Sequence, residues 1–173
     1  MFSKLVFGVI IMNCKGNMFL NKLLHCKPCA RALVTGSAEY PDIHGTVKSY
    51  KTDLGVIVCT EINGLPHQNI KCGISVFGFH IHEGVLCSGN EMDPFSNAMA
   101  HFNPDECTHP HHAGDLPPLF ENNGYVFSVF LTDRFRIDEI IGKTVIIHGN
   151  PDDFTTQPSG NSDAKIACGK ITV

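Results

Sequence analysis

The 173-residue sequence contains no tryptophan, three tyrosines and no apolar run approaching the roughly 18 residues that a membrane-spanning helix needs. It also has no basic tract, and its formal net charge is −4 with the histidines neutral. Because a chain without a basic patch cannot neutralise a phosphate backbone, general nucleic-acid binding is not expected. These absences favour a soluble protein without a membrane span, in which charge acts locally.

The N-terminal stretch over residues 1–17, "MFSKLVFGVIIMNCKGN", places a lysine before an apolar run of about eight residues, the shape of a minimal signal peptide. It lacks the small-residue cleavage site of such peptides. Met18 offers an alternative start, which would make the preceding residues an upstream extension. We expect residues 1–30 to be a leader or extension and residues 31–173 to form one domain. The protein would be cytoplasmic by default, and extracytoplasmic if the apolar segment acts as a signal.

The eight cysteines are too irregularly spaced for a small disulfide scaffold, and a chain of this length does not need one. Cys26 and Cys29 form a CxxC motif, but it lacks the following histidine of a haem site and the second CxxC of a zinc site. We therefore expect these two thiols to be incidental. Cys59 and Cys72 lie in apolar segments and are expected to be buried free thiols.

Short segments rich in Val, Ile, Phe and Thr, many of them alternating apolar with polar residues, predict strands. They lie at 30–36, 44–50, 55–62, 74–82, 124–132, 143–149 and 166–173. Clusters of turn residues separate them, and helical character is confined to 133–141. The pattern predicts an all-β fold, an antiparallel Greek-key sandwich or barrel of about eight strands. Two long loops, over 84–122 and 149–164, are expected to be functional, since structureless loops of this length are uncommon.

Histidine is the one clear compositional excess, and seven of the ten histidines lie between His80 and His148. In "GFHIHE", His80 and His82 are one residue apart, so on a strand their side chains point to the same face. Two imidazoles on one rigid face form half a site for copper, zinc or iron. A solvated polar strand face explains the pair equally well when it is taken alone.

The first long loop supplies a second set of metal-ligand types. It contains three histidines and one carboxylate in one short stretch: His101, His109, His112 and Asp115. Three nitrogens and one oxygen are the donors of a closed tetrahedral zinc site. Gly114 would let the backbone turn so that the neighbouring side chains converge. His148, at the end of a strand, is a further candidate ligand.

Six motifs, in this order, resemble the copper/zinc superoxide dismutases and specifically their bacterial branch: "GFHIHE", "HFNP", "HAGDL", "VIIHG", "NPDD" and "ACGKI". The resemblance runs from about Ser37 to Val173, and it agrees with the sandwich architecture that the strands predict. It implies one Cu and one Zn per chain. The implied copper ligands are His80, His82, His101 and His148. The implied zinc ligands are His101, His109, His112 and Asp115.

The resemblance also assigns roles around these metals. The imidazole of His101 would bridge them, and Asp152 matches an outer aspartate that links a copper histidine to a zinc histidine and fixes their orientation. His111 is out of register with the motif and is expected to face solvent or to pack on the loop. The implied activity is conversion of superoxide to oxygen and hydrogen peroxide by alternate reduction and oxidation of copper, with His101 carrying a proton. The alternative is a non-catalytic copper/zinc-binding module on the same fold, and a homodimer is possible in either case.

The resemblance pairs Cys168 with Cys87 in a disulfide, with Cys107 as a rival partner, and the bond would tether the first loop to the barrel. It also marks a departure, because Lys165 stands where the family usually has an arginine over the copper. Lysine keeps the positive charge but lacks the planar guanidinium that makes paired hydrogen bonds. We therefore expect Lys165 to attract the superoxide anion with reduced efficiency. The alternative is an ordinary exposed lysine.

Overall fold

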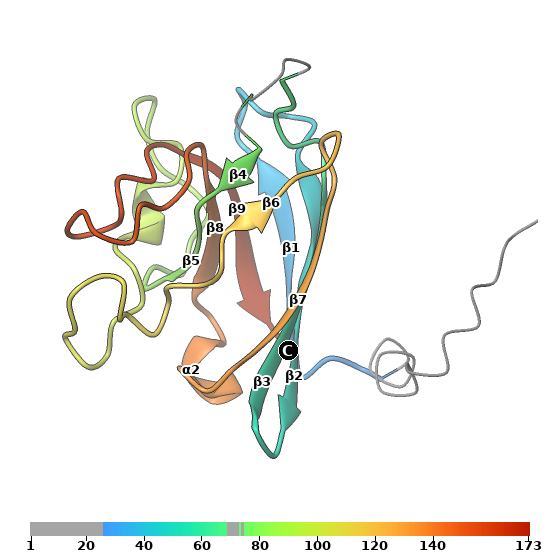
Figure 1. The fold of residues 1–173 in the computed structure, drawn as a ribbon, viewed down its shortest axis with the longest axis vertical. Helices are drawn as coiled ribbons and strands as arrows, with labels where there is room; N and C mark the ends of the chain where they lie inside the picture. The colour runs from blue at the N-terminus through green and yellow to red at the C-terminus, as the bar shows by residue number, and fades with distance from the viewer. Residues whose placement is uncertain (1–25, 69–72, 74) are drawn as a thin grey trace, which may run out of the picture.

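The computed structural model in Figure 1 describes residues 26–68, 73 and 75–173. Most of the expected leader over 1–30 lies outside these residues, as does Cys72, and Ala30 is already the first residue of a strand. None of the helices in the described ranges has the length and apolar character that a membrane span requires.

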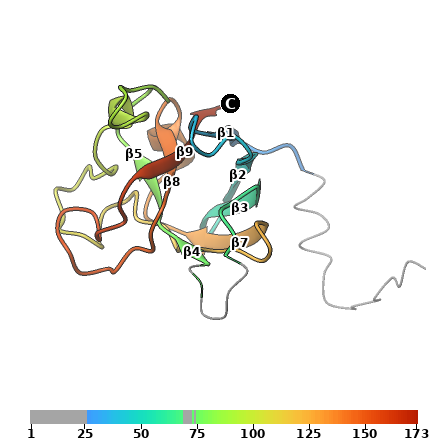
Figure 2. The ribbon, with the colours of Figure 1, turned by 90° about the horizontal axis from the view of Figure 1, so that it is seen from above.

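The described residues form nine strands and two short helices. In chain order these are β1 (Ala30–Gly36), β2 (His44–Thr52), β3 (Gly55–Asn63), β4 (Val76–Phe77), β5 (Phe79–His82), η1 (Ser96–Ala98), β6 (Leu119–Phe120), β7 (Val126–Thr132), α2 (Ile137–Ile140), β8 (Thr144–His148) and β9 (Lys165–Thr172). Seven strands form one antiparallel sheet in the order β5-β8-β9-β1-β2-β3-β7, and β4 pairs with β6 in a second sheet. Seen from above, the large sheet curls around a common interior (Figure 2).

Strand β1 alternates as its sequence predicts, whereas β3 and β9 each contain a run of consecutive buried residues. In β1 the alanines at 30 and 32 and Val34 are buried while the intervening residues are exposed, so one face packs on the core. Strands β5 and β8 differ because they are buried along their whole length. On β5, Phe79 and Ile81 pack in the main core. The opposite face of β5 is also buried, so it must be covered by residues outside the main core.

The two long loops cover that face. They lie together beside β5 and β8 in both views (Figures 1 and 2). The expected disulfide between Cys87 and Cys168 is present and joins the first loop to β9, while Cys107 is a free exposed thiol. Phe95 of the same loop packs against Ile146 and Cys168. The loop is thus fixed to the sheet by one covalent bond and one apolar cluster.

The all-β antiparallel prediction is confirmed, with three local differences. The strand expected over 74–82 divides at Gly78, whose N–H donates to the Asn150 carbonyl and whose carbonyl accepts from His148 N–H. Strand β6 had no signal, because two residues are too few to show a period. The helical segment amounts to one turn, α2. Cys59 is a buried free thiol, as expected.

Candidate metal centre

Strand β5 presents two imidazoles to the loops. His80 and His82 lie on the face opposite Phe79 and Ile81, and both are almost completely buried. The neighbouring strand β8 ends in His148, which is 4% exposed. Because alternate residues of a strand point to opposite faces, Phe79 and Ile81 of β5 face the core while both imidazoles face the loops.

The first group of donors consists of four buried histidines whose ligand atoms all lie within 4.8 Å of one another: His80, His82, His101 and His148. Backbone carbonyls orient two of these rings. His82 Nδ1 donates to the Met99 carbonyl at 2.8 Å and His148 Nδ1 to the Asp163 carbonyl at 3.1 Å. Their Nε2 atoms are therefore left facing each other, 3.3 Å apart.

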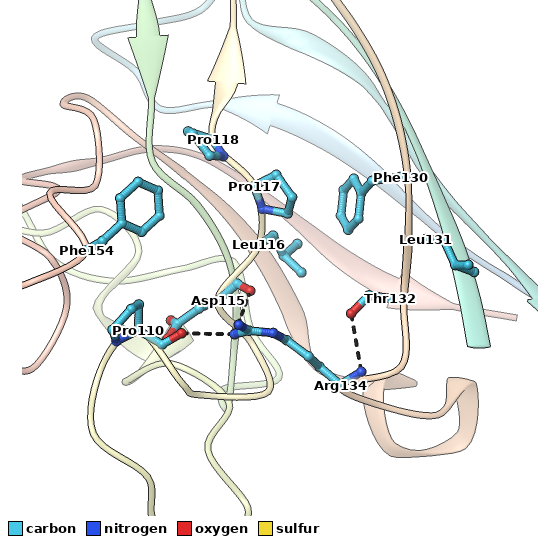
Figure 3. A pocket seen from close by; sticks show the side chains of 10 residues that line it. All are labelled: Pro110, Asp115, Leu116, Pro117, Pro118, Phe130, Leu131, Thr132, Arg134 and Phe154. Atoms are coloured by element: carbon cyan, nitrogen blue, oxygen red, sulfur yellow. Dashed lines mark hydrogen bonds between the residues drawn. The ribbon is translucent and has the colours of Figure 1, made fainter. Parts of the chain in front are cut away.

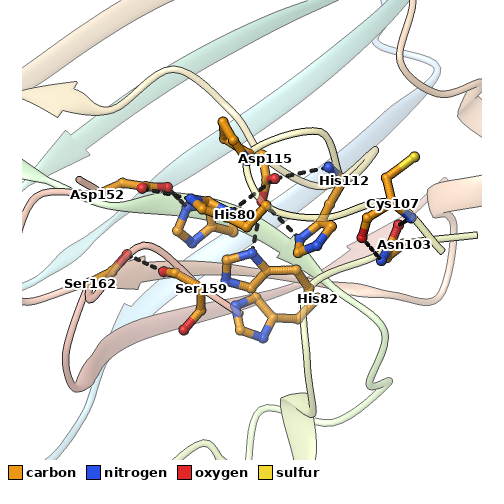
Figure 4. A network of polar contacts seen from close by, with 12 residues as sticks. His80, His82, Asn103, Cys107, His112, Asp115, Asp152, Ser159 and Ser162 are labelled. Carbon is orange, nitrogen blue, oxygen red and sulfur yellow. Dashed lines mark hydrogen bonds and ion pairs between the residues drawn. The ribbon is translucent and has the colours of Figure 1, made fainter. Parts of the chain in front are cut away.

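The second group lies in the first loop, again with all ligand atoms within 4.8 Å: His101, His109, His112 and Asp115. The Asp115 carboxylate is its centre. Its oxygens lie 2.8 Å from His101 Nδ1, 3.1 Å from His109 Nδ1 and 3.4 Å from His112 Nδ1. Figure 4 shows Asp115 at the centre of this network.

His101 belongs to both groups. Its Nδ1 contacts Asp115 in the second group, while its Nε2 has no hydrogen-bond partner among the described residues and is left for the first group. A short antiparallel bridge to His82 holds its backbone, and its ring lies 3.9 Å from the His80 ring, centroid to centroid. One ring therefore presents a nitrogen to each group.

Asp152, in the second long loop, connects the two groups by binding one histidine of each. Its Oδ2 accepts from His80 Nε2 at 2.7 Å and its Oδ1 from His109 Nε2 at 2.9 Å. The Phe154 N–H also donates to Oδ1, at 2.7 Å. A Cβ on Gly160 would lie only 1.9 Å from that oxygen, so the position requires glycine. Burial acts to raise the pKa of the Asp152 carboxyl, but these hydrogen bonds hold it well below its usual value.

The unpartnered atoms test whether the groups suit metal ions. Among the described residues, four buried ring nitrogens make no hydrogen bond of good geometry, although the last two lie 3.1 and 3.4 Å from Asp115 oxygens: His80 Nδ1, His101 Nε2, His109 Nδ1 and His112 Nδ1. Leaving a buried polar atom unpaired costs about 1–3 kcal/mol, so four in one place are not a feature of ordinary packing. All four belong to residues of the two groups. The donor sets, N₄ and N₃O, fit copper and zinc respectively.

The protonation states agree with this fit, since a metal binds neutral imidazole. Burial lowers the pKa of the His148 imidazole to about 3. Burial and the neighbouring imidazoles lower the pKa of His82 well below its usual value, and burial also lowers that of His80. At Asp115, burial acts to raise the carboxyl pKa, but the hydrogen bond from His101 and the nearby histidines bring it below the usual value. At neutral pH these three rings are therefore neutral, and the Asp115 and Asp152 carboxylates are ionised.

Two side chains far along the chain hold the first loop in place. Arg134, just after β7, directs Nη1 to the carbonyls of Pro110 at 3.0 Å and His112 at 3.1 Å. Figure 3 shows its guanidinium reaching this loop across a pocket of about 430 Å³. Gln157 donates to the His109 carbonyl at 2.7 Å and accepts from its N–H at 3.0 Å. Neither residue could be identified from the sequence, because no local pattern marks a side chain that binds a distant backbone.

The structure also shows the surroundings of His111, Gly114 and Lys165. His111 is exposed, as predicted. Gly114 is needed for a reason other than the turn proposed from sequence: its φ is not positive, and a Cβ there would meet the Ile81 carbonyl at 2.2 Å. Lys165 is not an ordinary exposed lysine, since its side chain is 17% exposed and its Nζ forms an ion pair with Asp93. It lies opposite His148 in the β8–β9 pairing.

A family model described as copper/zinc superoxide dismutase (SODC) matches residues 43–171. The chain is 30% identical over 145 residues to "Superoxide dismutase (Cu-Zn) 2" of Aquifex aeolicus, which covers 75% of this chain and 80% of that protein. It is 29% identical over 136 residues to a Cu-Zn superoxide dismutase of Legionella pneumophila, covering 73% of this chain and 76% of that one.

Matches from Bacillus subtilis, one a sequence and one a solved structure, carry a more reserved name. The "Superoxide dismutase-like protein YojM" is 35% identical over 119 residues, or 60% of this chain and 59% of that protein. The crystal structure of a double mutant of a SOD-like protein aligns with a TM-score of 0.66 and 30% identity, covering 83% of this chain and 97% of that chain. The family model spans well over half of the sequence, and the bacterial relatives agree with it. The chain therefore belongs to the copper/zinc superoxide dismutase family.

Proposed function

We propose that the protein is a superoxide dismutase that holds one copper and one zinc ion. The observation that carries the proposal is a pair of buried donor groups sharing one histidine, His101. Copper would be held by His80, His82, His101 and His148. Zinc would be held by His101, His109, His112 and Asp115.

Copper, when bound, supplies the one-electron redox chemistry that zinc lacks. In the net reaction one superoxide gives up an electron and leaves as oxygen, and a second takes up that electron with two protons to become hydrogen peroxide. The chain's part is to deliver one of those protons while the other comes from water. His101 suits this role because its Nε2 has no competing partner while Asp115 fixes its Nδ1. We assign the reversible proton to His101 Nε2.

The remaining residues keep the donors in place. Carbonyls of Met99 and Asp163 fix the tautomers of His82 and His148, so their Nε2 atoms stay available. Asp152 does the same for both groups at once. Lys165, next to His148 across the strand pair, is the proposed guide for the superoxide anion.

A second candidate function is copper and zinc binding without turnover. It is favoured by the ion pair between Lys165 and Asp93, which sets a carboxylate against the proposed anion guide. The Bacillus subtilis relative that is named only dismutase-like is consistent with such proteins existing in the family.

One experiment separates the two functions. The purified chain is loaded with copper and zinc, its metal content is measured, and superoxide decay is followed by pulse radiolysis with and without cyanide. We expect about one copper and one zinc per chain with cyanide-sensitive turnover. His82→Ala should abolish turnover. His111→Ala should not, because His111 is an exposed residue of the first long loop. Two bound metals without turnover would establish the second function, and zinc alone after copper loading would overturn both.

A further inference from the structure

We propose that Asp93 is a positioning residue that holds the Lys165 ammonium group and offsets its charge, so that the copper site binds small anions more weakly than a free lysine would allow. The inference rests on the proposed function, because it concerns the residue next to the copper group. Neither the motifs nor the family resemblance pointed to Asp93.

The Asp93 carboxylate is held in one orientation by its own loop. Its Oδ1 accepts the Phe95 N–H at 3.0 Å, which leaves Oδ2 for Lys165 Nζ. The Asp93 backbone is equally fixed, since its carbonyl accepts from Asn90 N–H at 3.0 Å and Ser96 N–H at 3.1 Å. A carboxylate locked in this way pairs at less entropic cost than one on a free side chain.

The two partners also sit on elements that are tied together. Lys165 begins β9, and Cys168 on the same strand forms the disulfide with Cys87 of the first long loop, which also contains Asp93. Phe95, two residues after Asp93, is buried against Cys168. Because the loop cannot move away from the strand, the lysine meets its carboxylate in the resting protein.

The surroundings add to the effect of the pair. The side chains are 17% exposed for Lys165 and 36% for Asp93, so solvent screens their attraction less than at an open surface. A pocket of about 510 Å³ beside Lys165 is also lined by Glu39 and Glu91. These carboxylates add negative charge beside a lysine that Asp93 already neutralises, which opposes the attraction that a lone cation would exert on an anion.

Azide affinity gives a readout that does not depend on turnover. In the copper- and zinc-loaded protein, azide binding is followed by the copper absorption spectrum. Asp93→Asn removes the charge but keeps an oxygen for the Phe95 N–H, so the loop should stay folded. We expect azide to bind about three- to tenfold more tightly in this variant, and turnover to become more sensitive to salt.

Two controls separate positioning from a general charge effect. Glu91→Gln makes the same charge change at an exposed residue of the pocket beside Lys165 and should alter the azide Kd by about twofold or less. In a Lys165→Ala background, Asp93→Asn should have no larger effect than Glu91→Gln, because its target is gone. Equal effects of Asp93→Asn with and without Lys165 would contradict a role that acts through the lysine.

The failures can be told apart. A copper spectrum without nitrogen ligation in the unaltered protein overturns the proposed function and this inference with it. A copper site with nitrogen ligands, whose azide Kd is unchanged by Asp93→Asn, overturns this inference alone.

Discussion

The two halves of the centre are built in different ways. The strand half, which consists of His80, His82 and His148, projects from paired strands whose other faces form the core. The loop half, which consists of His109, His112 and Asp115, lies in a segment whose residues between 102 and 115 form no strand or helix. His101 joins the two. A site can thus combine donors that the sheet places with donors that must be held individually.

The means of support differ accordingly. In the strand half, backbone carbonyls of the two long loops, 17 and 15 residues away, orient the rings of His82 and His148. The third ring, His80, donates to Asp152. In the loop half, the support comes from side chains distant in sequence, among them Arg134 and Gln157. Strand pairing and packing already fix the backbones of the strand-half donors, whereas the backbone of a loop donor has to be held by other residues. The loop half should therefore be the easier one to disrupt without unfolding the barrel.

The largest effects should come from removing one donor of each half. His148→Ala should lose copper and turnover while keeping zinc, because the zinc group does not include it. Asp115→Ala should lose zinc while the four-histidine group can still take copper. Metal content by mass spectrometry, measured with superoxide decay, checks both. If either variant lost both metals while its fold stayed intact, the division into two halves would be wrong.

The next largest effect is expected at Gly160. An alanine there has a φ of +69° to adopt, and its Cβ would lie 1.9 Å from Asp152 Oδ1. We expect Gly160→Ala to lower the free energy of unfolding by about 2 to 5 kcal/mol and to weaken zinc binding. Gly142→Ala is the matched control, since its φ is +91° but no atom of the part of the chain that the structure describes lies within 4 Å of the added Cβ. It should cost about 1 to 2 kcal/mol. Urea unfolding of both variants measures the difference. An equal loss of unfolding free energy in the two variants would show that the contact with Asp152 is not the cause.

Lowering the pH should destabilise the metal-free protein through the strand half. Burial lowers the pKa of His148 to about 3, below the ordinary value of 6.5, so the unfolded chain binds more protons between these values. Stability is then complete above pH 6.5 and falls as the pH drops toward 3. Each such histidine contributes up to about 1.4 kcal/mol per pH unit.

The free energy of unfolding, measured by urea titration between pH 7 and pH 4, checks this prediction. His148→Gln should make the pH dependence shallower, while His111→Gln, at an exposed position, should leave it unchanged. A pH dependence that is the same in all three proteins would show that the buried imidazole is not its source.

The smallest effect is expected at Arg134. Arg134→Ala removes hydrogen bonds to the Pro110 and His112 carbonyls and should weaken zinc affinity about tenfold, with copper binding unchanged. Competition with a chromophoric chelator measures the zinc affinity. Arg136→Ala is the matched control because its side chain is 70% exposed and pairs with surface carboxylates. Equal zinc affinity in the two variants would show that the clamp has no role.

The same contrast explains how much the sequence could predict. The alternation around His80 and His82 placed them on one face without any structure, because a strand has a strict period of two. The motifs of the family located the loop donors by resemblance. The ion pair between Lys165 and Asp93 joins residues 72 positions apart, and a contact of that kind leaves no local pattern.

The central claim is that two metals share His101, and anomalous diffraction at the copper and zinc edges of the loaded protein tests it most directly. The account predicts two peaks on opposite sides of the His101 ring, with copper among the strand-half histidines and zinc at the loop half. Zinc in the loop half with the strand half empty after copper loading, or two peaks of which only one contacts His101, would contradict it.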